Sequence, residues 1–136
     1  PGVGWPKCGE IDIMEYSGAS GSFTAAFHTG AYNYTNGGGG IQNVQGFSVA
    51  NHDTEFHTYG IEWTPARVAF YVDGKVVLTA DKSAMGGTLD QWPFDQPFWI
   101  KLNLAVGGSY GGDPASGTFP KTMEDDWVRL YQEPPQ

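Results

Sequence analysis

Basic residues are scarce in this chain, which carries 7 lysines and arginines against 15 aspartates and glutamates and has a formal net charge of -8. Nucleic-acid binding requires a basic surface that neutralises phosphates, so this balance argues against a nucleic-acid partner. The same charge disfavours polyanionic sugars such as sulfated galactans. A neutral polysaccharide is the better match for an acidic surface.

Long apolar runs and cysteine are also lacking. No apolar stretch approaches the roughly 20 residues of a membrane-spanning helix, so we expect no membrane partner. The single cysteine, Cys8, excludes an internal disulfide and leaves the compartment undecided. One cysteine with one histidine, His28, forms no nucleophilic constellation, and a small buried thiol is the ordinary interpretation.

Glycine, proline and aromatic residues are plentiful instead. The 136 residues include 20 glycines, 9 prolines and 5 tryptophans, with 40% hydrophobic side chains. This length suits one domain, and the many turn residues with few helical patterns predict an all-β fold. Tryptophans suit sugar stacking, although most are expected in the core.

The stretch at residues 9–16 places three carboxylates inside a hydrophobic strand pattern. Alternation puts Glu10 and Asp12 on one face and the isoleucines on the other, but would bury Glu15. A buried unpaired carboxylate is costly. One extra residue at Met14, a β-bulge, returns Glu15 to the acidic face and sends Tyr16 to the core. We therefore predict a catalytic strand; a solvated acidic edge is the alternative.

The motif Glu10-Ile11-Asp12-Ile13-Met14-Glu15 resembles that of glycoside hydrolase family 16, in its bulged form. The longer run 5–16 is similar to the laminarinase branch, the endo-β-1,3-glucanases, and the stretches 56–63 and 102–108 agree. The resemblance implies an all-β jelly-roll sandwich of two antiparallel sheets with a concave cleft. It covers the single domain 1–136, while the family domain is longer at its N-terminus.

The resemblance implies a retaining, endo-acting hydrolase of β-1,3-glucan that works by double displacement. In family terms Glu10 is the nucleophile, Glu15 is the acid/base, and Asp12 tunes both. Three acids in one cleft repel, so at least one pKa should be raised. A non-catalytic β-glucan-binding module and an inactive fragment are alternatives, and mixed-linkage β-1,3-1,4-glucan or a neutral galactan are alternative substrates.

Five further residues are candidates for binding. Trp5 either stacks on a sugar ring or packs its loop. His28 points into the cleft if the phenylalanines of residues 22–29 face the core, and the resemblance supports a cleft histidine there. Trp92 is a rim stacker or a hydrophobic latch, and Asn103 is a sugar hydrogen-bonder or part of a solvated face. Asp126 matches a calcium ligand of the family; calcium needs six to eight oxygens, so a solvated acidic cluster is the alternative.

In the rest of the chain, alternating apolar residues and turn residues predict strands joined by turns, with Asp73-Gly74 as a two-residue hairpin turn. A glycine-rich loop at residues 30–40 is expected at the cleft rim. The expected strands are residues 22–29, 41–49, 57–63, 68–72, 75–80, 98–106 and a last strand within 120–132.

Partners follow from the same reasoning. The expected substrate is a polymer met outside the cell, so we expect secretion with a signal peptide upstream of this chain. No cofactor is required for the chemistry; a structural calcium is the one ion considered. Strands absent from the chain would leave open edges, so we expect either a homodimer or pairing with a complementing N-terminal half.

Overall fold

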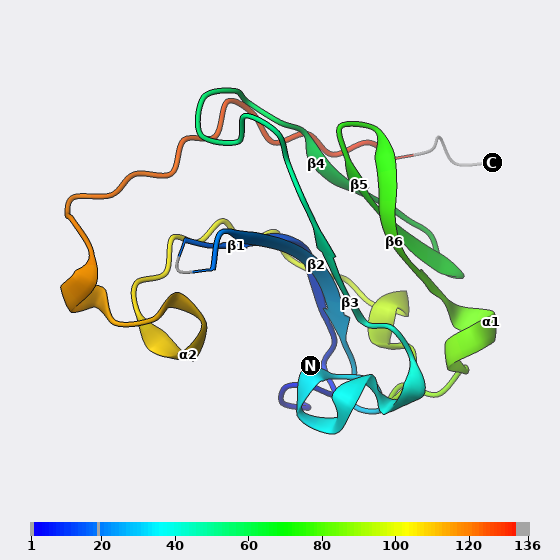
Figure 1. Ribbon diagram of the computed structural model, residues 1–136. Coiled ribbons are helices and arrows are strands. Elements are labelled where there is room, and N and C mark those ends of the chain that lie inside the picture. The colour runs from blue at the N-terminus through cyan, green and yellow to red at the C-terminus, as the bar shows by residue number, and fades with distance from the viewer. Residues whose placement is uncertain (1, 19, 133–136) are drawn as a thin grey trace. The chain divides into compact units, whose positions relative to one another are not determined.

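The computed structural model describes residues 2–18 and 20–132 and divides the chain into two compact units. The first unit is Pro1–Trp99 and the second is Ile100–Gln136. All strands found in the described residues belong to the first unit (Figure 1). Each unit is described by itself below.

Two antiparallel three-stranded sheets form the first unit. One sheet has the order β1 (Glu10–Ser17), β2 (Ser22–His28) and β3 (Val44–Phe47). The other has the order β4 (Tyr59–Trp63), β5 (Arg67–Val72) and β6 (Lys75–Asp81). Both sheets therefore consist of neighbours in sequence, and the expected all-β class with two antiparallel sheets is confirmed.

The turn between β5 and β6 has the predicted hairpin geometry. Asp73 and Gly74 have φ angles of 49° and 75°, as a two-residue turn with left-handed backbone requires. The Asp73 carboxylate accepts from the Thr58 backbone N–H at 3.0 Å and lies 2.9 Å from His57 Nδ1. The hairpin tip is thereby joined to the start of β4.

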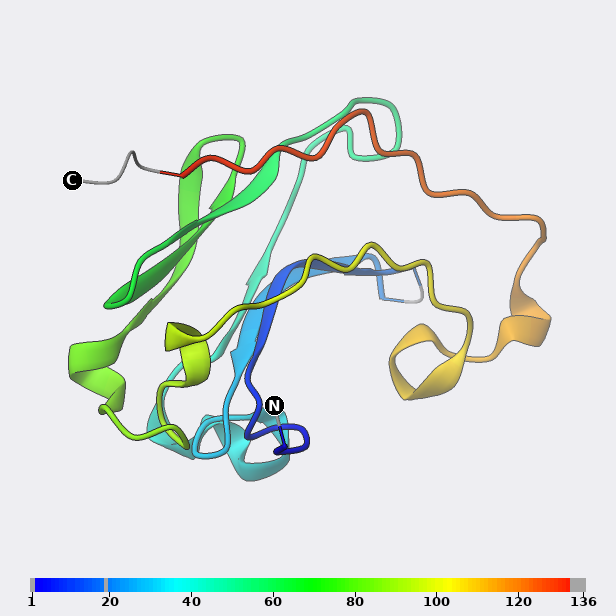
Figure 2. The same cartoon turned by 180° about the vertical axis from the view of Figure 1, so that it is seen from behind.

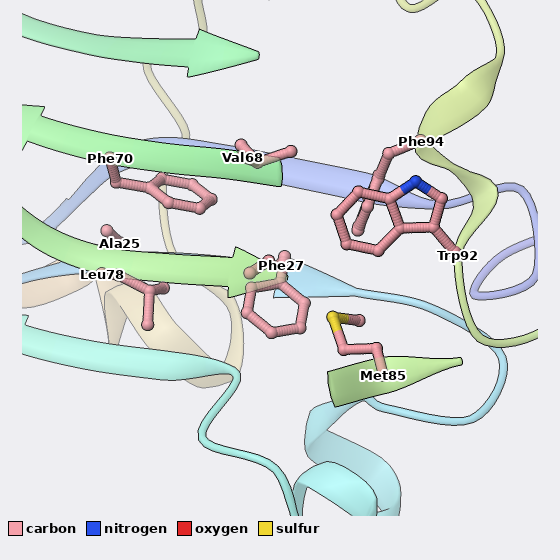
Figure 3. Packing of buried hydrophobic residues seen from close by; sticks show 9 residues of the cluster. Ala25, Phe27, Val68, Phe70, Leu78, Met85, Trp92 and Phe94 are labelled. Carbon is pink, nitrogen blue, oxygen red and sulfur yellow. The ribbon is translucent and has the colours of Figure 1, made fainter. Parts of the chain in front are cut away.

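The hydrophobic core lies between the two sheets (Figure 3). Phe27 of β2 and Phe70 of β5 are fully buried, and the Phe27 ring meets Phe94 edge-on at 6.2 Å between centroids. The cluster comprises Ala25, Phe27, Val68, Phe70, Leu78, Ala80, Met85, Trp92 and Phe94. Burying side chains of this size stabilises the unit by about 1.5–3 kcal/mol each, so the core fixes the sheet that carries the acids.

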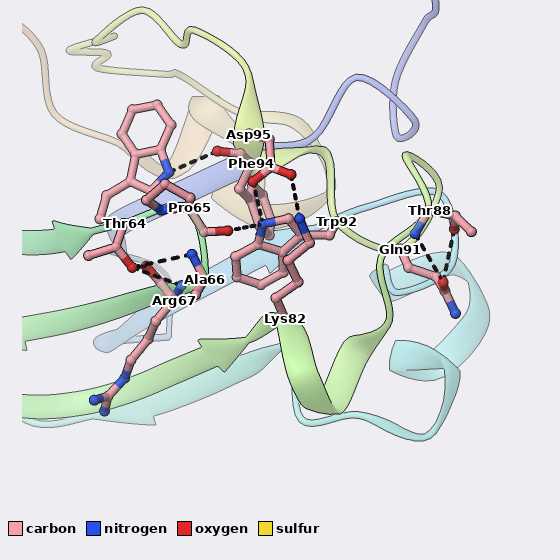
Figure 4. Close-up of polar contacts among 11 residues, drawn as sticks. Thr64, Pro65, Ala66, Arg67, Lys82, Thr88, Gln91, Trp92, Phe94 and Asp95 are labelled. Carbon is pink, nitrogen blue, oxygen red and sulfur yellow. Dashed lines mark hydrogen bonds and ion pairs between the residues drawn. The ribbon is translucent and has the colours of Figure 1, made fainter.

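The segment after β6 closes one end of this core. It forms the short helix α1 (Lys82–Met85) and a 3-10 turn at Pro93–Asp95. Trp92 is 2% exposed, and its Nε1 donates to Pro65 O and to Asp95 Oδ1, both at 3.0 Å (Figure 4). Trp92 is therefore the latch considered above and not a rim stacker, because its ring has no face open to a ligand.

The same segment supports the start of β1 (Figure 2). Gln96 Nε2 donates to the Cys8 carbonyl at 2.9 Å. Gly9 has a φ of 79°, and a Cβ there would lie 2.7 Å from Pro93 and 2.9 Å from Phe98. Only glycine fits both the backbone and the close approach, so Glu10 enters its strand from a fixed position.

The second unit has little regular structure in its described part. It contains α2 (Gly108–Gly111) and a 3-10 turn at Pro114–Ser116. The strands expected at 98–106 and within 120–132 are absent from the described residues, so those predictions are wrong. A strand persists only where its backbone groups pair with a neighbour, and alternation alone does not supply one. Among the described residues, no helix has the length and hydropathy needed to cross a bilayer.

Candidate active site

The three carboxylates of β1 lie on one face because the strand is bulged. Glu10 pairs with His28 and Asp12 pairs with Ala26, but Glu15 then pairs with Thr24, so Ile13 and Met14 together oppose one residue of β2. This is the bulge expected from the cost of burying Glu15. Facing partners in a sheet point to the same side, and the acids therefore share their face with His28.

Tyr16 departs from the expectation. It pairs with Phe23, and the two rings are 4.5 Å apart, but Tyr16 remains 43% exposed. It lies on β1, an edge strand of its sheet, which leaves one side of the ring uncovered. The prediction that the bulge sends Tyr16 into the core is therefore wrong, although its ring does pack against a core residue.

His28 lies beside the acids, as its place in β2 predicted. Its Nε2 is 3.5 Å from Asp12 Oδ2, and its ring is buried. Ligand atoms of Glu10, Asp12 and His28 all lie within 4.8 Å of one another, which makes them a group that can hold a metal ion among the described residues. Asp126 is not part of such a group there, and calcium at Asp126 stays a prediction.

Trp5 joins the site from the loop before β1. Its Nε1 donates to Glu10 Oε2 at 2.6 Å, and its ring meets His28 edge-on at 6.0 Å between centroids. The indole is 44% exposed. Trp5 thus binds one carboxylate and also has an exposed aromatic surface, and its stacking on a sugar ring stays a prediction.

Tyr34, Asn43 and Thr24 also reach the site, and none was singled out from the sequence. The Tyr34 ring lies 5.4 Å from Trp5 and 5.6 Å from His28. Asn43 Nδ2 is 3.3 Å from His28 Nδ1, and Thr24 Oγ1 donates to Glu15 at 3.5 Å. Thr24 was predictable from the alternation of β2, whereas no sequence signal placed Tyr34 or Asn43.

The expected rim loop at residues 30–40 contains the 3-10 element Tyr34–Gly40, which is interrupted by non-helical backbone at Asn36, Gly37, Gly38 and Gly39. Asn33 caps it: its side chain accepts from Thr35 N, while Asn36 Oδ1 accepts from Asn33 N. Left-handed backbone at Gly37, Gly38 and Gly39 then turns the chain. This cap directs Tyr34 to the site.

Burial and mutual repulsion perturb the acids. Burial, with the charges of Glu10 and Glu15, raises the pKa of Asp12 to about 8. Burial and Glu10 also raise the pKa of Glu15, against the hydrogen bond from Thr24. Burial lowers the pKa of His28, although Glu10 opposes this. At neutral pH the contact between Asp12 and His28 therefore joins two uncharged groups and is no ion pair.

Asn103 and Asp126 lie in the second unit and are exposed. Asn103 falls in an extended segment without strand pairing, and Asp126 lies at a bend. Their roles in sugar and calcium binding stay predictions.

Three carboxyl groups lie on one sheet face beside an exposed indole, and two of them have raised pKa values. This is the kind of site that glycoside hydrolysis uses. The comparison with known families agrees. The family model described as glycosyl hydrolases family 16 matches residues 3–129. The chain belongs to this family.

Several related proteins align with most of this chain. A "Beta-glucanase" of Rhodothermus marinus is 38% identical over 94% of this chain and 46% of its own length. A "Keratan-sulfate endo-1,4-beta-galactosidase" of Sphingobacterium multivorum is 35% identical over 96% of this chain and 30% of its own length. The laminarinase structure from Rhodothermus marinus has a TM-score of 0.73 at 36% identity, with 85% of this chain and 48% of that one covered. The chain spans less than half the length of each.

Proposed function

We propose that this chain provides the catalytic strand of an endo-acting, retaining hydrolase of β-1,3-glucan. The observation that carries the proposal is the bulged β1, which holds Glu10, Asp12 and Glu15 on one face beside His28 and Trp5. Membership of the family and the names of its relatives support the same class of reaction.

Glu10 and Glu15 each take one role in the proposed double displacement. Glu10 attacks the anomeric carbon, and Glu15 gives its proton to the departing glycosidic oxygen. Water then attacks the anomeric carbon of the glycosyl–Glu10 ester and releases Glu10, while Glu15 accepts a proton from that water. Burial and the charge of Glu10 raise the pKa of Glu15, which keeps the group protonated closer to neutral pH, as a general acid requires.

Charge and aromatic surface support the choice of a neutral glucan. The net charge of -8 would repel a sulfated chain, and the exposed rings of Trp5 and Tyr34 can stack on sugar rings. By their names, one relative is a beta-glucanase and another acts on keratan sulfate, which is a sulfated galactan. Mixed-linkage glucan, a neutral galactan and keratan sulfate are therefore the competing substrates to assay.

The test is reducing-sugar release from laminarin by the chain and by Glu10→Gln. We expect release by the unchanged chain and a loss of at least about a thousandfold in the variant, since the covalent step is then removed. Glu62→Gln is the matched control, because Glu62 is an exposed strand carboxylate bonded to Tyr71 on the other sheet. Its activity should stay unchanged.

Two outcomes would contradict the proposal. Equal activity in Glu10→Gln would remove the assigned nucleophile, and a first product of inverted anomeric configuration, read by proton NMR, would remove the retaining mechanism. No release by either chain would favour the β-glucan-binding alternative, which calorimetry with laminarin measures directly.

We also propose that the protein is secreted and that the chain associates with a second copy or with a complementing segment. The second unit exposes alternating apolar side chains at Ile100, Leu102, Leu104 and Val106. Exposed apolar runs favour association, which supports self-association or a complementing segment. A single monomeric species in sedimentation, together with cooperative unfolding, would contradict this.

A further inference from the structure

Asn43 contacts the buried imidazole of the site on the side away from the acids. It directly precedes β3, it is 6% exposed, and its Nδ2 lies 3.3 Å from His28 Nδ1. No role in the chemistry proposed above falls to this residue. Its hydrogen bonds nevertheless decide which nitrogen of His28 carries the proton.

The orientation of the Asn43 amide is fixed by the backbone. Its Nδ2 also lies 3.1 Å from the carbonyl oxygen of Phe27, which can only accept a hydrogen bond. The NH₂ group must therefore face that carbonyl, and its second hydrogen points to His28. A flipped amide would set the Oδ1 oxygen against the Phe27 oxygen, which repels it.

Because Asn43 donates a hydrogen bond to the imidazole, each ring nitrogen can be only a donor or only an acceptor. Nδ1 must accept, so the proton of a neutral imidazole lies on Nε2. Burial lowers the pKa of His28 and thus favours the neutral ring. Nε2 faces Asp12 Oδ2 at 3.5 Å, with Glu10 in the same group of atoms. Trp5 and Tyr34 both meet the ring edge-on or nearly so and hold its plane.

We propose that Asn43 is a positioning residue that locks His28 in the Nε2–H tautomer, so that His28 presents a neutral donor to the catalytic acids. This proposal extends the function proposed above. The donor adds no charge to a site with three carboxyl groups.

Gly38 makes room for this contact. Its φ is +78°, and a Cβ there would lie 2.6 Å from Asn43 Oδ1. The left-handed turn of the glycine segment therefore admits the Asn43 amide at the depth at which it reaches His28. The glycines serve the site through this packing and need no ligand of their own.

The first test reads the tautomer without any assay of activity. Long-range proton–nitrogen correlation spectra of the ¹⁵N-histidine chain at about pH 7.5 distinguish protonated from unprotonated ring nitrogens. The chain has 3 histidines, and His28→Gln identifies the signals of His28. We expect Nε2 protonated and Nδ1 bare. A proton on Nδ1 overturns the proposal even if the chain hydrolyses laminarin.

The second test reverses the hydrogen bond. Asn43→Asp has the same shape but can only accept, so Nδ1 should gain the proton and the spectrum should change to the other tautomer or to the imidazolium. On laminarin we expect kcat to fall about 10- to 100-fold, with KM changed less than threefold and the pH profile displaced. The side chains that would bind the sugar are unchanged in this variant, whereas the proton that His28 presents to the acids is moved.

The matched control is Gln42→Glu, which adds the same charge one residue away on an exposed side chain that bonds Gln45. Its spectrum and kcat should equal those of the unchanged chain. If Asn43→Asp does not fold, Asn43→Ala removes the donor without a charge and should give a mixture of tautomers. An unaltered Nε2–H tautomer in a folded Asn43 variant overturns the proposal, whereas inactivity of the unchanged chain overturns only the proposed hydrolase.

Discussion

The raised pKa of Asp12 predicts an unusual dependence of stability on pH. Asp12 has a pKa of 3.8 when unperturbed and about 8 in the folded chain, because it is buried beside Glu10 and Glu15. Between these two values the folded state holds a proton that the unfolded state has released. The free energy of unfolding contributed by Asp12 must therefore fall as the pH rises from about 4 to about 8, and must be level above that.

The size of the effect follows from the two pKa values. They differ by about 4 units, and each unit corresponds to 1.36 kcal/mol, which gives an upper limit of about 6 kcal/mol. Such a cost is comparable with the about 5–15 kcal/mol that stabilise a whole domain. Because the Asp12 side chain is 16% exposed, water reaches it in part, and we expect at least about 2 kcal/mol of this cost to persist.

The experiment compares Asp12→Asn with the unchanged chain. Urea denaturation followed by tryptophan fluorescence at pH 4 to 9 gives the free energy of unfolding of each. The amide is neutral throughout, so the variant should become more stable relative to the unchanged chain across this range. An exchange of amide for acid can shift the whole curve, but it cannot produce the slope.

Asp73 should contribute to stability with the opposite dependence on pH. The Thr58 N–H and His57 hold the pKa of Asp73 below its usual value of 3.8. Its contribution to stability is present above that pH and is lost as the pH falls through the lowered pKa. Asp73→Asn should therefore be less stable than the unchanged chain at neutral pH, with the difference vanishing in acid. The burial argument is refuted if the difference in the free energy of unfolding between Asp12→Asn and the unchanged chain varies by less than about 0.5 kcal/mol from pH 4 to 9.

Two further substitutions test the aromatic residues. Tyr34→Ala should raise KM for laminarin about 3- to 10-fold with little change in kcat, because a stacking ring contributes about 0.5–1.5 kcal/mol; Tyr34→Phe is the control, and an equal rise in both would exclude stacking. Trp92→Phe should lower the free energy of unfolding by about 1–3 kcal/mol, because the buried bond from its Nε1 to Pro65 O is lost. Its KM should stay within twofold, and a larger change would return Trp92 to the binding site.

The sequence was sufficient where local chemistry constrained the answer. The bulge followed from the cost of burying Glu15, and the position of His28 followed from the alternation of Phe23, Ala25 and Phe27. These inferences need only one strand and its neighbour. The hairpin at residues 73–74 is of the same kind, since Asp-Gly is suited to left-handed backbone.

The sequence was insufficient where the outcome depended on a distant partner. The alternation at residues 98–106 is as regular as that of β2, yet no strand forms there in the described residues, and the side chains of residues 99–106 are exposed. Trp92 illustrates the converse case. Its sequence pattern was compatible with a rim or a core position. Its Nε1 donates to the Pro65 carbonyl, 27 positions earlier in the chain, and this contact holds it in the core.

The site itself combines both situations. The acids come from one strand and could be read from it, but the proposed tautomer of the histidine beside them depends on Asn43, which lies 15 residues away in sequence, just before β3. That contact requires Gly38 in a left-handed conformation and the Phe27 carbonyl at the edge of β2. A motif thus identifies which groups can react. The packing around them determines which nitrogen of His28 holds the proton, and this is the part of the chemistry that only the folded chain specifies.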